Sequence, residues 1–169
     1  MRRRISGAHF NPAVTLVMTL RGTLKPGDAT LYVCAQIGGC VAGALLAHGM
    51  FELPLLQHGA HQRSGWAQGL SEAVAAFALV LTVLLVSRAR VNAIAAAVAL
   101  VIAAGYWWRA STSFANPAIT VARAMSDSFA GIRWADTPLF IGAQLGGALL
   151  ASYVASLVWR DPPAKRSGP

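Results

Sequence analysis

Four long apolar stretches constrain the fold of this chain more than any other feature of its sequence. They lie at about residues 28–51, 66–87, 92–108 and 137–159. A helix crosses the hydrocarbon core of a bilayer with about 20 mostly apolar residues, so each stretch is long enough to be a membrane span. Only 12% of the residues are charged, about half of what a soluble domain carries. The sequence therefore predicts an all-α membrane protein and excludes a soluble globular domain and a disordered chain.

Two shorter segments begin with the same tripeptide, Asn-Pro-Ala, at 11–13 and 116–118. Asparagine is a favoured helix N-cap, and proline is favoured at the first helical position. We therefore predict short helices at about 11–21 and 116–126. At 1.5 Å per residue, each is roughly 15 Å long, which is half of a bilayer. Two half-length helices with the same cap predict re-entrant segments whose N-terminal ends meet at the membrane midplane.

An internal repeat places these short helices in equivalent positions. Besides the tripeptide, Ala-Gln-Ile-Gly-Gly at 35–39 matches Ala-Gln-Leu-Gly-Gly at 143–147. The second unit reads as span, span, half helix, span, whereas the first contains only a half helix and a span. We therefore expect four spans where two complete units would have six. An odd number of spans in each unit makes the two units run in opposite directions through the membrane.

The basic residues support one orientation in the membrane. The chain has 14 lysines and arginines, six acids and a formal net charge of +8. When the first half helix enters from the cytoplasm and returns there, ten basic residues lie on the cytoplasmic side and four outside. This distribution obeys the positive-inside rule and predicts a cytoplasmic C-terminus. Because the basic residues separate apolar spans, we expect membrane lipid and no nucleic acid as a partner.

The cysteines and the chain ends indicate no other class of protein. Cys34 and Cys40 share one apolar stretch, so we expect small packing residues rather than a disulfide framework, and no metal or other cofactor. The basic residues at 1–4 precede a polar segment, which argues against a cleaved signal peptide. The polar, proline-containing tail at 161–169 is predicted to be disordered. No nucleophile–base arrangement is apparent, so an enzyme is not expected.

The motif-bearing segments resemble a known family. Residues 6–15, Ser-Gly-Ala-His-Phe-Asn-Pro-Ala-Val-Thr, and 114–118, Phe-Ala-Asn-Pro-Ala, look like the two signature loops of the aquaporin/aquaglyceroporin, or major intrinsic protein, family. The resemblance implies a channel domain over residues 1–160 that is similar to the last four of six spanning helices plus both half helices. It also implies a passive channel for small neutral solutes, a homotetramer with one pore per subunit, and the inner membrane of a bacterium.

The chemistry of the motifs is consistent with such a channel. Two helix N-termini bring two positive dipole ends to one point, where the Asn11 and Asn116 amides can donate hydrogen bonds. A waist rich in donors passes neutral hydroxylated solutes and opposes cations and protons. The expected constriction comprises Asn11, Pro12, Ala13, Asn116, Pro117 and Ala118, and the carbonyl groups expected to line the path belong to Gly7, Ala8, His9, Thr112 and Phe114.

Three polar residues inside the spans are expected to support this arrangement. Glu72 lies one turn into its span, and a carboxylate at that depth is costly unless it is hydrogen-bonded. It resembles a family glutamate that supports loop backbone, so we expect a structural role rather than a proton site. Gln36 and Gln144 occupy equivalent places in the repeat, and we expect each to bond across helices.

The chain departs from the family pattern at the outer mouth. Ile119 stands where most members have arginine, which removes a charge and a donor. Ala104 is expected at the second filter position, with Ser113 as a further lining candidate. Arg123 lies on the same helix face as Ile119, and we expect either a role in the pore or an interfacial or ion-paired residue, with Asp127 available as a partner.

An apolar mouth without arginine predicts permeation by solutes larger than water. The same segment looks like a bacterial branch linked to arsenic resistance, which implies neutral arsenite or methylated arsenicals as cargo beside water and glycerol. The alternative hypothesis is a truncated, non-conducting remnant, because two helices that would wall the pore are missing and half-helix backbone facing lipid is expensive.

Overall fold

The computed structural model describes residues 9–158, and every regular element in that range is helical. The elements are α1 (Pro12–Leu20), α2 (Pro26–Met50), α3 (Trp66–Ala89), η1 (Val91–Ala93), α4 (Ile94–Trp108), α5 (Pro117–Ala124), η2 (Trp134–Asp136) and α6 (Thr137–Val158). The expected carbonyls of Gly7 and Ala8 and the tail at 161–169 lie outside the described residues.

The four expected spans are confirmed as four helices that are long and apolar enough to cross a membrane. Their bounds differ from the sequence-based ranges by a few residues. The second helix, α2, begins at Pro26 rather than 28, since proline at the first helical position loses no intrahelical hydrogen bond. The 3-10 turn η1 leads directly into α4, so the third span runs over Val91–Trp108.

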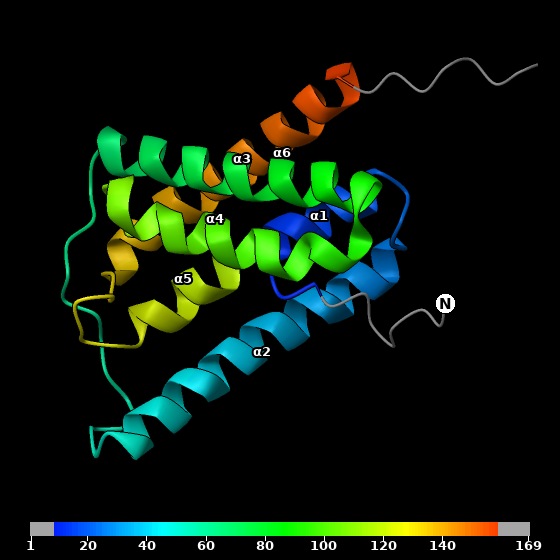
Figure 1. Cartoon of the computed structure of the whole chain (residues 1–169). Helices are drawn as coiled ribbons and strands as arrows, with labels where there is room; N and C mark the ends of the chain where they lie inside the picture. The colour runs from blue at the N-terminus through cyan, green and yellow to red at the C-terminus, as the bar shows by residue number, and fades with distance from the viewer. Residues whose placement is uncertain (1–8, 159–169) are drawn as a thin grey trace, which may run out of the picture.

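The centre of the molecule is the packing of α3 against α6, with the half helix α1 inserted beside them (Figure 1). The main core cluster comprises Ala13, Val14, Val17, Val80, Val83, Leu84, Ala148, Ala151 and Ala155. Small residues on α6 permit this close approach. At Gly147 an added Cβ would collide with the backbone carbonyl of Ala73 on α3. The core therefore fixes α1 to the pair α3–α6.

The helices α2 and α4 are much less covered. In its most apolar 18-residue stretch, α2 has 6% of its residues buried, as does the span that contains α4, against 44% in α3. Figure 1 shows α2 running along one side of the molecule, where it packs against the half helices α5 and α1. The outer faces of α2 and α4 are therefore left to lipid or to further protein.

Candidate functional site

Each half helix begins with the asparagine cap that the sequence predicts. Asn11 is extended (φ −145°) and its Oδ1 accepts from the Ala13 amide at 2.9 Å. Asn116 is also extended (φ −156°), and its Oδ1 accepts from the amides of Ala118 at 3.0 Å and Ile119 at 3.4 Å. Proline follows both asparagines and carries no N–H. The orphan donors of each first turn are thus partly satisfied by one side chain.

The same two asparagines join the half helices to each other. The Asn11 Nδ2 donates to the Ala115 carbonyl at 2.7 Å, and the Asn116 Nδ2 donates to the Phe10 carbonyl at 2.9 Å. An amide nitrogen has two hydrogens, so each asparagine keeps a second donor beyond this bond. Both side chains are 7% exposed. The reciprocal bonds bring two positive helix ends and two amide donors to one place.

The loop before α5 has an unusual backbone that a buried carboxylate stabilises. Thr112, Ser113 and Ala115 have φ values of 59°, 54° and 48°, in the left-handed region that non-glycine residues rarely adopt. Glu72 of α3 is fully buried and accepts from the Phe114 amide at 2.9 Å and the Ala115 amide at 2.8 Å. These charge-assisted bonds determine the shape of the loop.

The two glutamines occupy equivalent places in the two repeats. The Gln144 Nε2 donates to Glu72 at 2.6 Å and to the Thr120 Oγ1 at 3.0 Å, which links α6 to α3 and α5. The Gln36 Nε2 donates to the His9 carbonyl at 2.7 Å and to the Thr15 Oγ1 at 2.8 Å, which links α2 to α1 and its preceding loop. Each glutamine therefore forms hydrogen bonds between helices. The His9 carbonyl, which was expected to line the path, accepts a hydrogen bond from Gln36.

The two carbonyls of the second loop that are expected to line the path differ from the His9 carbonyl in their hydrogen bonding. Within residues 9–158, no hydrogen-bond donor of the protein lies on the carbonyl oxygen of Thr112 or Phe114. The positive φ values rotate these peptide planes relative to a helical path. The two oxygens therefore have no protein donor within the described residues.

The expected filter residues are only partly brought together. Ile119 is partly exposed on α5, and Ala104 is exposed on α4. The Ser113 side chain is 2% exposed, and its hydroxyl accepts from the Arg109 Nη1 at 2.8 Å. It packs against Gly105, where an added Cβ would lie 2.5 Å from the Ser113 Oγ. Ser113 therefore joins α4 to the loop.

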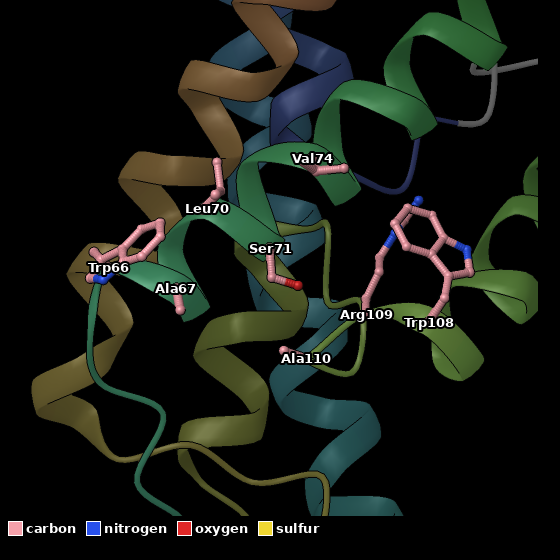
Figure 2. A pocket seen from close by; sticks show the side chains of 8 residues that line it. All are labelled: Trp66, Ala67, Leu70, Ser71, Val74, Trp108, Arg109 and Ala110. Carbon is pink, nitrogen blue, oxygen red and sulfur yellow. The ribbon is translucent and has the colours of Figure 1, made fainter.

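Sequence analysis missed Arg109 and its surroundings. The guanidinium lies over the Trp108 ring, 4.3 Å from its centroid, as Figure 2 shows. Beside it is a cavity of about 290 Å³ between α3 and α4, to which Ser71 also contributes. The Ser71 hydroxyl is 3.0 Å from that of Ser111 and so ties α3 to the same loop. Polar residues in a loop follow no helical or strand periodicity, so the contacts of Arg109 could not be predicted from the spacing of residues in the sequence.

Arg63 was also missed, although it is 4% exposed. It lies between α2 and α3, and its guanidinium donates to the carbonyls of Gly131 at 2.8 Å, Phe129 at 2.9 Å and Ser111 at 3.3 Å. Burial lowers the pKa of Arg63, and the positive charge of Arg123 lowers it further, while Glu72 opposes the shift. Arg63 therefore cross-links the outer loops without a carboxylate on its guanidinium within the described residues.

Arg123 does not make the ion pair that its spacing allows. The Asp127 carboxylate accepts from the Ala60 amide at 3.3 Å instead. The Arg123 guanidinium lies over the Phe114 ring, 4.2 Å from its centroid, and its Nη2 is 3.4 Å from the Tyr106 hydroxyl. Of the two expectations for Arg123, pairing with Asp127 is therefore wrong for the described residues.

Comparisons with known proteins agree with this geometry. A model of the family "Major intrinsic protein" matches residues 1–93. Aquaglyceroporin AqpS of Rhizobium meliloti (strain 1021) is 50% identical over 161 residues, which cover 95% of this chain and 68% of that protein. Aquaporin-1 of Laccaria bicolor is 36% identical over 86 residues, 50% of this chain and 28% of that protein. Neurogenic protein big brain of Drosophila melanogaster is 50% identical over 46 residues, 27% of this chain and 7% of that protein.

Proposed function

Since the chain belongs to the major intrinsic protein family, we propose that it conducts water, glycerol and other small uncharged solutes passively across a membrane. The observation that carries this proposal is the reciprocal bonding of Asn11 and Asn116 to each other's loops. It leaves one amide hydrogen of each asparagine for a passing hydroxyl group. Two positive helix ends at the same point oppose cations and protons.

The residues around this point provide a path with donors on one side and acceptors on the other. The proposed constriction is formed by the two Asn-Pro-Ala segments, and the proposed acceptors are the carbonyls of Thr112 and Phe114. A hydroxylated solute exchanges its water contacts for these groups. Irregular backbone at this depth is tolerated where it lines a wet cavity.

Small and apolar residues beyond the constriction favour solutes larger than water. Ile119 contributes no charge or donor, and Ala104 occupies little volume. We propose these two residues as the inner filter, with Ser113 as a further lining candidate. The similarity to an aquaglyceroporin over 95% of the chain supports glycerol as a permeant, and neutral arsenite and methylated arsenicals are further candidate cargo.

We also propose a homotetramer in the inner membrane of a bacterium, with the C-terminus in the cytoplasm. The orientation is supported by the ten-to-four distribution of basic residues. The assembly is supported by α2 and α4, whose faces within the described residues are mostly uncovered. Apolar helix faces without a protein partner are suited to lipid or to a second subunit.

The same uncovered faces favour a second candidate, a subunit that does not conduct alone. In the most apolar stretches of both helices only 6% of the residues are buried, so neither helix is covered by a further described helix. Backbone groups that face lipid are costly. In this second case the chain contributes half helices to an assembly but forms no closed path.

Stopped-flow light scattering on proteoliposomes separates these candidates. Glycerol and arsenite are expected to enter proteoliposomes faster than they enter empty liposomes. Ile119→Arg is expected to lower both fluxes at least about tenfold, because the larger side chain narrows the inner filter. Ile119→Val is the matched control and should change little. A chimera in which two spanning helices of a major intrinsic protein precede this chain provides the comparison for the second candidate.

Each outcome decides between the proposals. Flux through the chain that falls in Ile119→Arg supports the conducting path and the Arg-free filter. Flux through the chimera alone supports the non-conducting subunit. No flux through either would overturn the proposed channel function.

A further inference from the structure

Arg123 lies near the C-terminal end of α5, one helical turn beyond Ile119. It follows Ile119 by four residues and Asn116 by seven, and residues at such spacings share one helix face. Ile119, Val121 and Arg123 are partly exposed, whereas Thr120 and Ala122 are buried. Of the partly exposed residues, Arg123 shares the helix face of Ile119 by its spacing. One helical turn, about 5.4 Å, separates the two residues along α5.

The guanidinium is held across the mouth between two elements. It lies over the Phe114 ring at 4.2 Å, and its Nη2 reaches the Tyr106 hydroxyl at 3.4 Å. Tyr106 belongs to α4, so the contact between Arg123 and Tyr106 joins α5 to α4. The Arg123 carbonyl accepts from the Ile132 amide at 3.3 Å, which anchors this end of α5 to the outer loop.

The charge of Arg123 is not neutralised by the described residues. Within residues 9–158 no carboxylate lies at ion-pair distance from its guanidinium. Asp127 instead accepts a hydrogen bond from the Ala60 amide. Asp136 forms its ion pair with Arg133. The Arg123 Nη1 has no hydrogen-bond partner within this range. Arg63 lies over the same Phe114 ring at 5.1 Å, and its guanidinium donates only to carbonyls. Two cations without a carboxylate partner among the described residues therefore flank the Phe114 ring.

We propose that Arg123, positioned by Tyr106 and Phe114, is the selective side chain of the outer mouth and supplies the cationic donor that Ile119 lacks. The inference rests on the proposed channel function and names the solute class. A fixed positive charge raises the energy of a cation at the mouth and attracts acceptor oxygens. Small uncharged solutes with several oxygens, such as polyols and undissociated oxyacids, are selected over alkylammonium ions of similar size.

The local field can be measured without any flux. In a chain with Cys34→Ser and Cys40→Ser, Ile119→Cys is modified by a negatively charged sulfonatoethyl thiosulfonate or a positively charged trimethylammonioethyl thiosulfonate. The ratio of the two rates is expected to favour the anionic reagent. Arg123→Gln is expected to lower this ratio at least about tenfold, because a unit charge about 6 Å away changes the two rates in opposite directions by about threefold each even at the dielectric constant of water.

Matched variants separate charge from structure. Arg123→Lys keeps the charge and is expected to keep most of the ratio. Arg133→Gln removes another outer arginine, one that is paired with Asp136, and is expected to change the ratio less than twofold. A ratio unchanged by Arg123→Gln would overturn the inference. If neither reagent modified Ile119→Cys, the water-filled path itself, and hence the proposed function, would be contradicted.

Flux provides the second readout. The ratio of methylammonium to glycerol permeability is expected to rise at least fivefold in Arg123→Gln. The double variant Ile119→Arg with Arg123→Gln places an arginine at the inner filter instead of at Arg123. It is expected to restore the exclusion of methylammonium. Normal glycerol flux with an unchanged ratio in Arg123→Gln overturns the role of Arg123 and leaves the channel intact.

Discussion

The half helices α1 and α5 begin with the same three residues but are supported by different chemistry. The loop before α5 is held by a buried carboxylate, because Glu72 accepts from two backbone amides and from Gln144. The described part of the loop before α1 is held by an amide, because Gln36 donates to the His9 carbonyl. The Gln36 Oε1 is buried and has no hydrogen-bond partner among the described residues. One repeat thus has a charged anchor that the other lacks within residues 9–158.

The spanning helices that follow the half helices differ in the same way. Gly147 on α6 lies directly against the backbone of α3, whereas its repeat equivalent, Gly39 on α2, has no atom within 4 Å of an added Cβ. The capped ends are alike in both repeats because capping depends on adjacent residues. Support of the loop differs because it depends on a third helix, and α3 provides that helix only for the second repeat.

The largest expected difference between the repeats follows from removing their anchors. Glu72→Ala leaves three buried donors unpaired and is expected to lower the free energy of unfolding by about 4 kcal/mol. Gln36→Ala removes one neutral donor and is expected to cost about 1–2 kcal/mol. Urea titration in detergent micelles, followed by tryptophan fluorescence, measures both. Equal losses would show that the two loops are supported equally.

A smaller difference is expected at the paired glycines. Gly147→Ala introduces a methyl group against the Ala73 carbonyl, so α3 and α6 must separate at a cost of about 2 kcal/mol. Gly39→Ala meets no atom and is expected to be neutral or to stabilise by up to about 1 kcal/mol through helix propensity. The same titration compares them. A loss in Gly39→Ala as large as in Gly147→Ala would show that another helix covers α2.

The smallest difference is expected at the caps, where the repeats are alike. Asn11→Ala and Asn116→Ala each remove an N-cap acceptor and are expected to cost about 1.5 kcal/mol. Their two losses should agree to within about 0.5 kcal/mol, and glycerol flux should fall in both. Thermal unfolding in micelles measures the stabilities. A much larger loss in one variant would indicate that the caps, and not only their supports, are unequal.

The sequence predicts those features that arise from adjacent residues. Apolar length located the spans, and Asn-Pro-Ala located both half helices, since a cap and a proline act within one turn. The positions of Arg63 and Arg109 could not be predicted, because each contacts a loop that only tertiary packing brings near. The burial of Ser113 has the same origin, since a left-handed backbone at 112–115 turns its hydroxyl toward Arg109.

The reciprocal asparagine bonds also set an order for assembly in the cell. The donor and acceptor of these bonds are 104 and 106 residues apart in the chain. At about 5–20 residues per second, the ribosome delivers the second partner roughly 5–20 s after the first. Until then neither bond between the two half helices can form. The joining of α1 to α5 is therefore a late, non-local step that follows synthesis of α5.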